Sequence, residues 1–282
     1  MEVALQLLPA TIAGILYALR THTLAATPRA VPTWRKACFY GGLTLIVVSL
    51  TAMGPLADEL FWAHMVEHLI VGDVGALLLV LGLTGPLLAP VLRIRFFDRL
   101  RVLAHPAIAF PLWALDLYVW HLPALHEAAV RHGGVHALQH ACFVAFGVNM
   151  WMALFGPLPK PAWFGNLARL GYILAVRLYG TILANIFVWS DKPIYDVYVG
   201  GVNDQVIAGS IMMVEGSILT LGLGCWLFLR AANQGEERQQ LMELAQARGV
   251  PLDERRAARA VSAGRGDELR RRLEAGETLS RR

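Results

Sequence analysis

Long apolar segments constrain the fold of this chain more than any other feature of its sequence. About 20 mostly apolar residues are enough for a helix to cross the hydrocarbon core of a bilayer. The 282-residue sequence contains seven such segments, at about 3–20, 37–54, 60–90, 103–121, 135–156, 167–190 and 204–229. The sequence therefore predicts an all-α integral membrane protein, a bundle of seven transmembrane helices. Because the third segment is overlong, we expect it to tilt or to begin outside the hydrocarbon.

The composition agrees with a membrane protein and argues against several other classes. Charged residues make up 16% of the chain and hydrophobic residues 56%, whereas soluble domains contain about 25% charged residues. The three cysteines form no CxxC pair, which argues against a disulfide framework or a thiolate copper chaperone. The sequence contains no nucleic-acid-binding motif.

Basic residues are distributed unevenly between the two sides of the predicted bundle. Ten lie in or beside the first, third and fifth loops, whereas only Arg131 and Lys192 lie in the loops of the other side. Because basic loops remain in the cytoplasm, we expect the N-terminus outside and the C-terminus in the cytoplasm. Beyond the last span the chain becomes rich in Arg, Glu and Gln. This predicts a transmembrane domain over 1–230 and a charged tail over 231–282, helical or partly disordered.

Histidines gather at the outer ends of three neighbouring predicted spans. Two pairs have a spacing of four residues, and a third pair lies around the outer end of the fourth span: His64 and His68, His136 and His140, His121 and His126. Because residues four apart share one face of a helix, two such faces on adjacent helices can hold a metal ion between them. Neutral imidazole binds copper or zinc well. The six histidines are therefore predicted metal ligands, the alternative being ordinary hydrogen-bonded residues at the membrane interface.

Several carboxylates accompany the histidines. Glu67 stands between the first pair and is expected to orient a ligand or to balance charge. Four ionisable residues lie deep inside predicted spans: Asp73, Asp116, Arg177 and Glu215. Because a lone charge at that depth is costly, we expect Arg177 to pair with one or more of the three acids, as a structural clamp or as part of the function. Asp204 begins the seventh span and is predicted to be its N-cap.

Three ordered sequence blocks point to a known family. They are HMVEH followed by LLLVLGLTGP, WHLPALHEAAV followed by HALQH, and PIYDVY followed by DQVIAG. Through these blocks, residues 35–230 resemble the CtaG-type assembly factors of caa3-type cytochrome c oxidase, which are seven-span bacterial membrane proteins. The matching positions are His64, His68, His121, His136, His140 and Asp204. The sequence departs from the family pattern at Glu67, and again after the DQVIAG block, where it has Met212 and Met213 followed by Glu215.

The resemblance implies a role in the maturation of a haem–copper oxidase. It implies a multi-pass protein of the bacterial inner membrane that handles copper on the extracytoplasmic side. The implied partners are an oxidase subunit or a copper donor protein, within the lipid bilayer. The resemblance favours a protein without enzymatic activity over an enzyme but does not decide between them, and the sequence leaves the oligomeric state open.

The HMVEH segment also matches H-x-x-E-H, a metallopeptidase signature. On this alternative the same histidines hold Zn²⁺ and Glu67 activates water as a general base. The protein would then be a zinc-dependent, membrane-embedded hydrolase. A distant carboxylate from Glu127, Asp191 or Asp204 would complete its ligand set. Bound Zn²⁺ with hydrolytic activity, against bound copper without it, separates the two interpretations.

Overall fold

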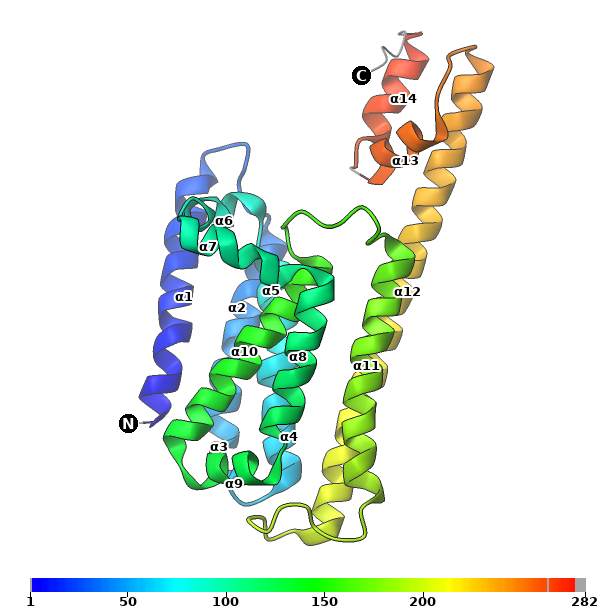
Figure 1. Cartoon of the computed structure of the whole chain (residues 1–282). Coiled ribbons are helices and arrows are strands. Elements are labelled where there is room, and N and C mark those ends of the chain that lie inside the picture. The colour runs from blue at the N-terminus through cyan, green and yellow to red at the C-terminus, as the bar shows by residue number, and fades with distance from the viewer. Residues whose placement is uncertain (1, 263, 277–282) are drawn as a thin grey trace. The chain divides into compact units, whose positions relative to one another are not determined.

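The computed structural model describes residues 2–262 and 264–276, which form helices and no strand (Figure 1). The chain divides into two compact units, residues 1–220 and 221–282. In chain order the elements before the first long loop are α1 (Glu2–Ala25), α2 (Thr33–Val48), η1 (Ser49–Met53), α3 (Gly54–Ala57), α4 (Phe61–Leu69), η2 (Ile70–Gly75), α5 (Ala76–Gly82), α6 (Gly85–Leu92), α7 (Arg95–Leu100), η3 (Arg101–Ala104), α8 (Pro106–Trp120), α9 (Pro123–Arg131) and α10 (Gly133–Phe155). After residues 156–165 follow α11 (Asn166–Trp189), α12 (Gly201–Ala247), α13 (Glu254–Ser262) and α14 (Gly266–Glu274).

Five helical stretches of the described residues are long and apolar enough to cross a membrane: Thr33–Ala57, Phe61–Gly82, Gly133–Phe155, Asn166–Trp189 and Gly201–Ala247. A sixth is added if α7, η3 and α8, which are bent by 81°, form one broken span. Helix α1 covers the first predicted span but is not among the five. The predicted all-helical membrane protein is confirmed in this coarser form. The count of seven and the orientation of the termini stay predictions.

The third predicted span is shorter than its apolar sequence. Its helix is continuous from Phe61 to Gly82, and then Leu83 and Thr84 adopt extended backbone conformations. Pro86 lies in the first turn of α6, a position that suits its fixed φ and its missing N–H. The overlong segment is therefore a 22-residue span followed by a separate short helix.

Two glycines allow α10 to lie directly against the third span. The third span contains a π-helical segment, η2, in which Gly72 faces α10. A methyl group at Gly147 of α10 would overlap the carbonyl oxygen of Gly72. Small residues of this kind permit close helix contacts inside membranes. The contact fixes the position of α10 relative to α4, which runs directly into η2.

The outer surface of α11 is apolar along its length. Four half-exposed aliphatic residues follow one another at intervals of four: Leu174, Leu178, Ile182 and Ile186. Residues at this spacing form one stripe of a helix. A continuous exposed apolar stripe agrees with a lipid-facing helix.

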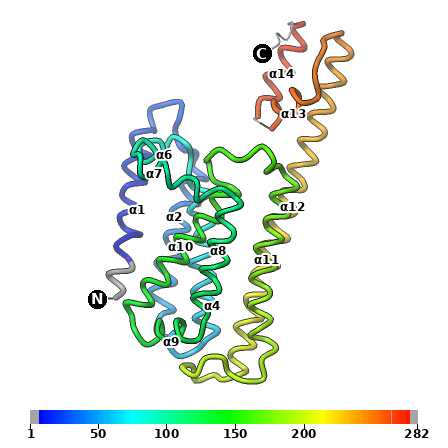
Figure 2. Tube along the Cα trace, in the orientation of Figure 1, coloured from blue at the N-terminus to red at the C-terminus, as the bar shows by residue number. Residues whose placement is uncertain are grey.

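The histidine-bearing elements meet at one end of the first unit. Figures 1 and 2 show the start of α4, the short helix α9 and the start of α10 at the same end. An aromatic cluster lies beside them, in which Phe61 of α4 packs with Phe187 of α11 and Tyr195 of the following loop. This packing sets the first turns of α4 in place.

The second unit has its own small core. It is built from the C-terminal part of α12 with α13 and α14, around Leu241, Ala245, Val261, Leu269 and Leu273. Gly249 has a φ of +65° and ends the long helix in the left-handed conformation that glycine adopts without strain.

Candidate metal centre

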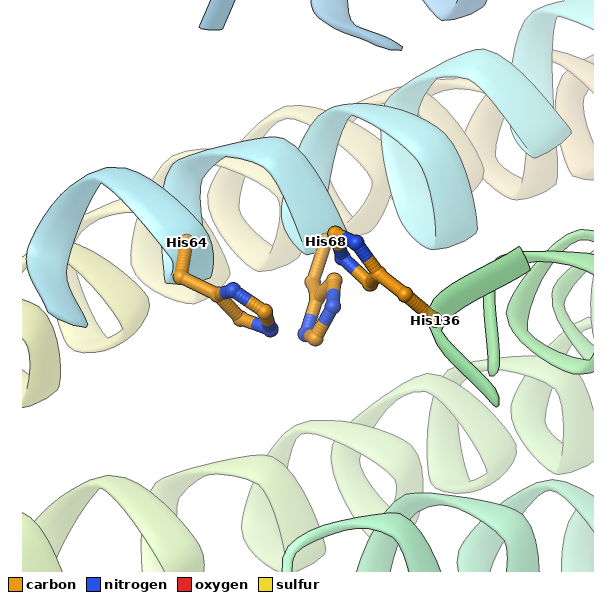
Figure 3. A group of neighbouring side chains, drawn as sticks. All are labelled: His64, His68 and His136. Atoms are coloured by element: carbon orange, nitrogen blue, oxygen red, sulfur yellow. The ribbon is translucent and has the colours of Figure 1, made fainter. Parts of the chain in front are cut away.

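Helix α4 presents two buried imidazoles on one face. His64 and His68 are separated by one helical turn, and their ring centroids lie 4.2 Å apart. Figure 3 shows both side chains projecting from the same helix, with His136 reaching toward them from another. The exposed fractions of His64 and His68 are 0% and 7%. The i, i+4 spacing therefore brings the two rings together, as expected.

Helix α10 supplies the second pair of imidazoles. The ring centroids of His136 and His140 lie 4.2 Å apart, and both side chains are buried. The ring of His136 stacks on that of His64 at 5.1 Å and 14°. On the other side of the cluster, His140 Nε2 lies 3.9 Å from Glu67 Oε2. The two helices therefore face one another through histidines and one carboxylate.

Among the described residues, two sets of side chains are compact enough to hold a metal ion. The first set contains three imidazoles, from His64, His68 and His136. The second set contains the Glu67 carboxylate with His136 and His140. Within each set the ligand atoms lie within 4.8 Å of one another. His136 belongs to both sets, so it stands at the middle of the cluster.

The hydrogen bonding of the ring nitrogens of His64 and His68 indicates whether a metal ion fits the cluster. Both ring nitrogens of His64 and both of His68 are buried, and none makes a hydrogen bond with another described residue. Buried polar atoms are nearly always hydrogen-bonded, and leaving one unsatisfied costs about 1–3 kcal/mol. A metal ion bonded to one nitrogen of each ring would remove part of this cost. The residues present therefore fit a metal that prefers imidazole.

His121 follows α8 and lies in an orientation typical of a metal ligand. Its Nδ1–H donates a hydrogen bond of 2.6 Å to the carbonyl oxygen of Leu117, which leaves the lone pair on Nε2. Nε2 is buried and makes no hydrogen bond within the described part of the chain. A backbone carbonyl on one ring nitrogen commonly fixes the tautomer of a metal-binding histidine. Burial lowers the pKa of His121 to about 4, against the opposing effect of the bond to Leu117, so the ring is neutral at pH 7.

His126 of α9 borders the cluster but is held by tyrosines. Its Nε2 lies 2.7 Å from the Tyr198 hydroxyl, and its ring stacks on that of Tyr195 at 4.0 Å. The rings of His126 and His64 are 4.8 Å apart. Burial, followed by the neighbouring His121 and His136, lowers the pKa of His126. This side chain is therefore a neighbour of the cluster whose orientation the tyrosines fix.

Tyr195, in the loop between α11 and α12, packs against the histidine cluster. Its side chain is only 3% exposed. Its hydroxyl donates a hydrogen bond of 2.7 Å to the backbone oxygen of His121. The loop therefore supports the histidines from behind. Only the position of the tyrosines in the PIYDVY block could have indicated this role.

Asp204 caps a different helix from the one expected. Its predicted place was the N-cap of its own helix, but α12 begins three residues earlier, at Gly201. The Asp204 carboxylate instead accepts hydrogen bonds from the backbone N–H groups of Phe61, at 2.7 Å, and Trp62, at 2.9 Å. The first N–H groups of a helix have no acceptor within the helix itself. Asp204 therefore stabilises the helix that carries His64.

The deep charges form a second cluster. Arg177 of α11 makes two hydrogen bonds to Asp73 of η2, at 2.7 and 3.1 Å, and one of 3.4 Å to Glu215 of α12. The indole N–H of Trp151 also donates to the Asp73 carboxylate. The expected pairing of Arg177 is thus present with two of the three acids. The third, Asp116, makes no ion pair with Arg177 among the described residues.

Comparison with known proteins identifies one family. The model of the cytochrome c oxidase caa3 assembly factor family (Caa3_CtaG) matches residues 15–234. The match covers both helices of the histidine cluster and all of the deep charges. No curated protein and no solved structure matches the chain.

Proposed function

The chain belongs to the cytochrome c oxidase caa3 assembly factor family, and from this membership we propose that its histidine cluster binds copper and passes it toward the oxidase. Its partner is then a haem–copper oxidase or the copper donor of that oxidase. The ion is cargo, held during assembly and then given up. The histidine cluster lies on the extracytoplasmic side of the bacterial inner membrane in the orientation that the loop charges predict.

One observation carries the proposal. Four buried ring nitrogens, two each on His64 and His68, make no hydrogen bond to another described residue. A hydrogen-bonded structural role would have supplied partners for at least some of these atoms. Copper and zinc are the common ions that neutral imidazoles hold. Membership in an oxidase assembly family favours copper between the two.

The ligand chemistry also suits an ion that must leave again. A cluster with more donors than one ion needs can exchange ligands one at a time. His121 offers a further buried Nε2, with its ring 6.2 Å from that of His68. His121 is therefore placed to take over the ion from the α4 pair.

The zinc hydrolase finds no support in this geometry. None of the carboxylates that would complete its ligand set belongs to either compact group among the described residues. The Asp204 carboxylate is occupied by the backbone of α4, and that of Glu127 by Arg131 and the Asp196 N–H. Glu67, the expected base, lies within a ligand set itself.

The test uses the host cell and the purified protein together. The variant His64→Ala/His68→Ala is compared with the wild type and with His132→Ala, which removes an exposed histidine preceding α10. We expect the double variant to lose Cu(I) binding in detergent and to yield oxidase that keeps haem but lacks copper. His132→Ala should match the wild type in both measurements. Normal copper in the oxidase of cells with the double variant would rule out the proposal.

A further inference from the structure

We propose that the cluster contains two overlapping metal positions that share His136, and that one ion exchanges between them. This inference rests on the proposed copper function and adds a path within the site. The first position is the three-imidazole set of His64, His68 and His136, and the second is the set of Glu67, His136 and His140.

The helical register creates the two positions. On α4, His64 and His68 lie one turn apart, and Glu67 precedes His68 directly, about 100° around the helix. On α10, His136 faces the first pair and His140 lies one turn further along. Glu67 meets His140, with 3.9 Å between Oε2 and Nε2. The two helices therefore offer a second ligand set one turn further along α10 from the first.

The shared histidine limits the cluster to a single ion. A neutral imidazole has one nitrogen with a free lone pair, because the other nitrogen carries the proton. His136 can therefore bind an ion in either position, but not an ion in each, unless its ring loses a further proton. Two cations only a few ångströms apart would also repel each other strongly. The two positions are alternatives for the same ion.

The two positions favour metal ions of different charge. Three neutral imidazoles give the first position no negative charge, which suits the monovalent ion Cu(I). The Glu67 carboxylate gives the second position one negative charge and a hard oxygen donor, which suits a divalent ion such as Cu(II) or Zn²⁺. The cluster can thus hold Cu(I) in the first position and Cu(II) in the second, which lies further along α10. The movement is ligand exchange alone, with His136 retained throughout and no bond of the protein broken.

The test measures the affinity of each position with a matched ion. Full-length protein in detergent is titrated with Cu(I), in competition with a Cu(I) chelator, and separately with Cu(II). Glu67→Gln removes the negative charge with little change in shape, and His64→Ala removes a ligand of the first position only. Electron paramagnetic resonance of the Cu(II) form reports whether the carboxylate is bound.

We expect opposite effects from the two variants. Glu67→Gln should lower the affinity for Cu(II) by at least about tenfold, change the Cu(II) spectrum and leave the affinity for Cu(I) unchanged. His64→Ala should lower the affinity for Cu(I) and leave the Cu(II) spectrum unchanged. His136→Ala should weaken both, and the wild type should bind one ion of either kind. Circular dichroism and gel filtration verify that each variant is folded.

Three results would overturn the inference, and they are separable from failure of the proposed function. If Glu67→Gln and His64→Ala weaken Cu(I) and Cu(II) alike, the cluster is one centre, and copper handling still stands. If the wild type binds two ions at once, His136 is not a shared ligand, and copper handling again stands. If the wild type binds neither ion, the proposed function fails together with the two positions.

Discussion

Arg177 and Asp73 form a two-bonded ion pair between α11 and η2, with Nη1–Oδ2 at 2.7 Å and Nη2–Oδ1 at 3.1 Å. Asp73 lies five residues beyond His68 on the same continuous helical span. The pair therefore ties α11 to the span that carries half of the histidine cluster. Trp151 of α10 donates to the same carboxylate, so three helices meet at Asp73.

Replacing Arg177 by Met should destabilise the protein strongly. The change leaves Asp73 and Glu215 buried without their cation, and breaking a buried ion pair from one side typically costs about 3–5 kcal/mol. The midpoint of thermal unfolding in detergent measures the effect. Arg131→Met is the matched control, because the Arg131–Glu127 pair is exposed on its arginine side and such pairs contribute about 0–1 kcal/mol. Equal midpoints for the two variants would contradict a structural role of the deep pair.

Replacing Gly147 by Ala should push α10 away from the third span. The added methyl group overlaps the Gly72 carbonyl oxygen, and overpacking of this kind costs about 1–3 kcal/mol or more. Because α10 carries His136 and His140, the variant should also bind copper more weakly. Thermal unfolding and copper titration measure both effects. Gly171→Ala on α11 adds a methyl group into open space and should change neither; a matching loss in that control would show that the contact is unimportant.

Replacing Asp204 by Ala should loosen the start of α4. The change removes the acceptor of the Phe61 and Trp62 N–H groups, and loss of a cap costs about 0.5–2 kcal/mol. Hydrogen exchange of the first α4 amides should become faster, and copper affinity should fall because His64 lies in this segment. Asp191→Ala changes an exposed carboxylate in the preceding loop and should leave both unchanged. Unaltered exchange in Asp204→Ala would exclude the capping role.

The free energy of unfolding should increase with pH in mildly alkaline solution, because of Lys160. Burial, followed by the nearby Arg169, lowers the pKa of Lys160 to about 8, below its ordinary value near 10.4. Between these two values the unfolded chain keeps a proton that the folded protein has released, so the free energy of unfolding increases with pH. The ammonium group also donates to the carbonyl oxygens of Met152 and Ala153 near the end of α10.

Thermal unfolding midpoints at a series of pH values measure the contribution of Lys160. The wild type should gain stability relative to Lys160→Met as the pH rises through this window. Identical pH profiles for the two proteins would show that the lysine keeps its ordinary pKa in the folded state.

The helices and the facing of their histidines were predictable from local sequence. Spacing alone places His64 with His68 and His136 with His140, because both pairs obey the periodicity of an α-helix. Spacing cannot give the rotation of one helix about its axis relative to the next. For this reason the central position of His136 and the meeting of Glu67 with His140 are visible only in three dimensions.

Contacts between distant segments account for the remaining differences. Asp204 caps a helix that begins 143 residues earlier in the chain, and no local pattern marks such a cap. Asp116 is as buried as Asp73, yet among the described residues it makes no ion pair with Arg177, and no local pattern tells which deep acids the arginine meets. The third span ends at Gly82, and the backbone becomes extended at Leu83. The apolar segment of the sequence nevertheless continues to about residue 90.

The loop between α11 and α12 is attached to the histidine cluster by hydrogen bonds. The Tyr195 hydroxyl holds the backbone of His121, and Tyr198 contacts the ring of His126. A protein that docked on this loop and displaced its tyrosines would release both histidines in the same movement. If the cluster holds copper, as proposed, recognition of the recipient and release of the ion would then be one event, and copper would not be lost to bulk water before the recipient arrived.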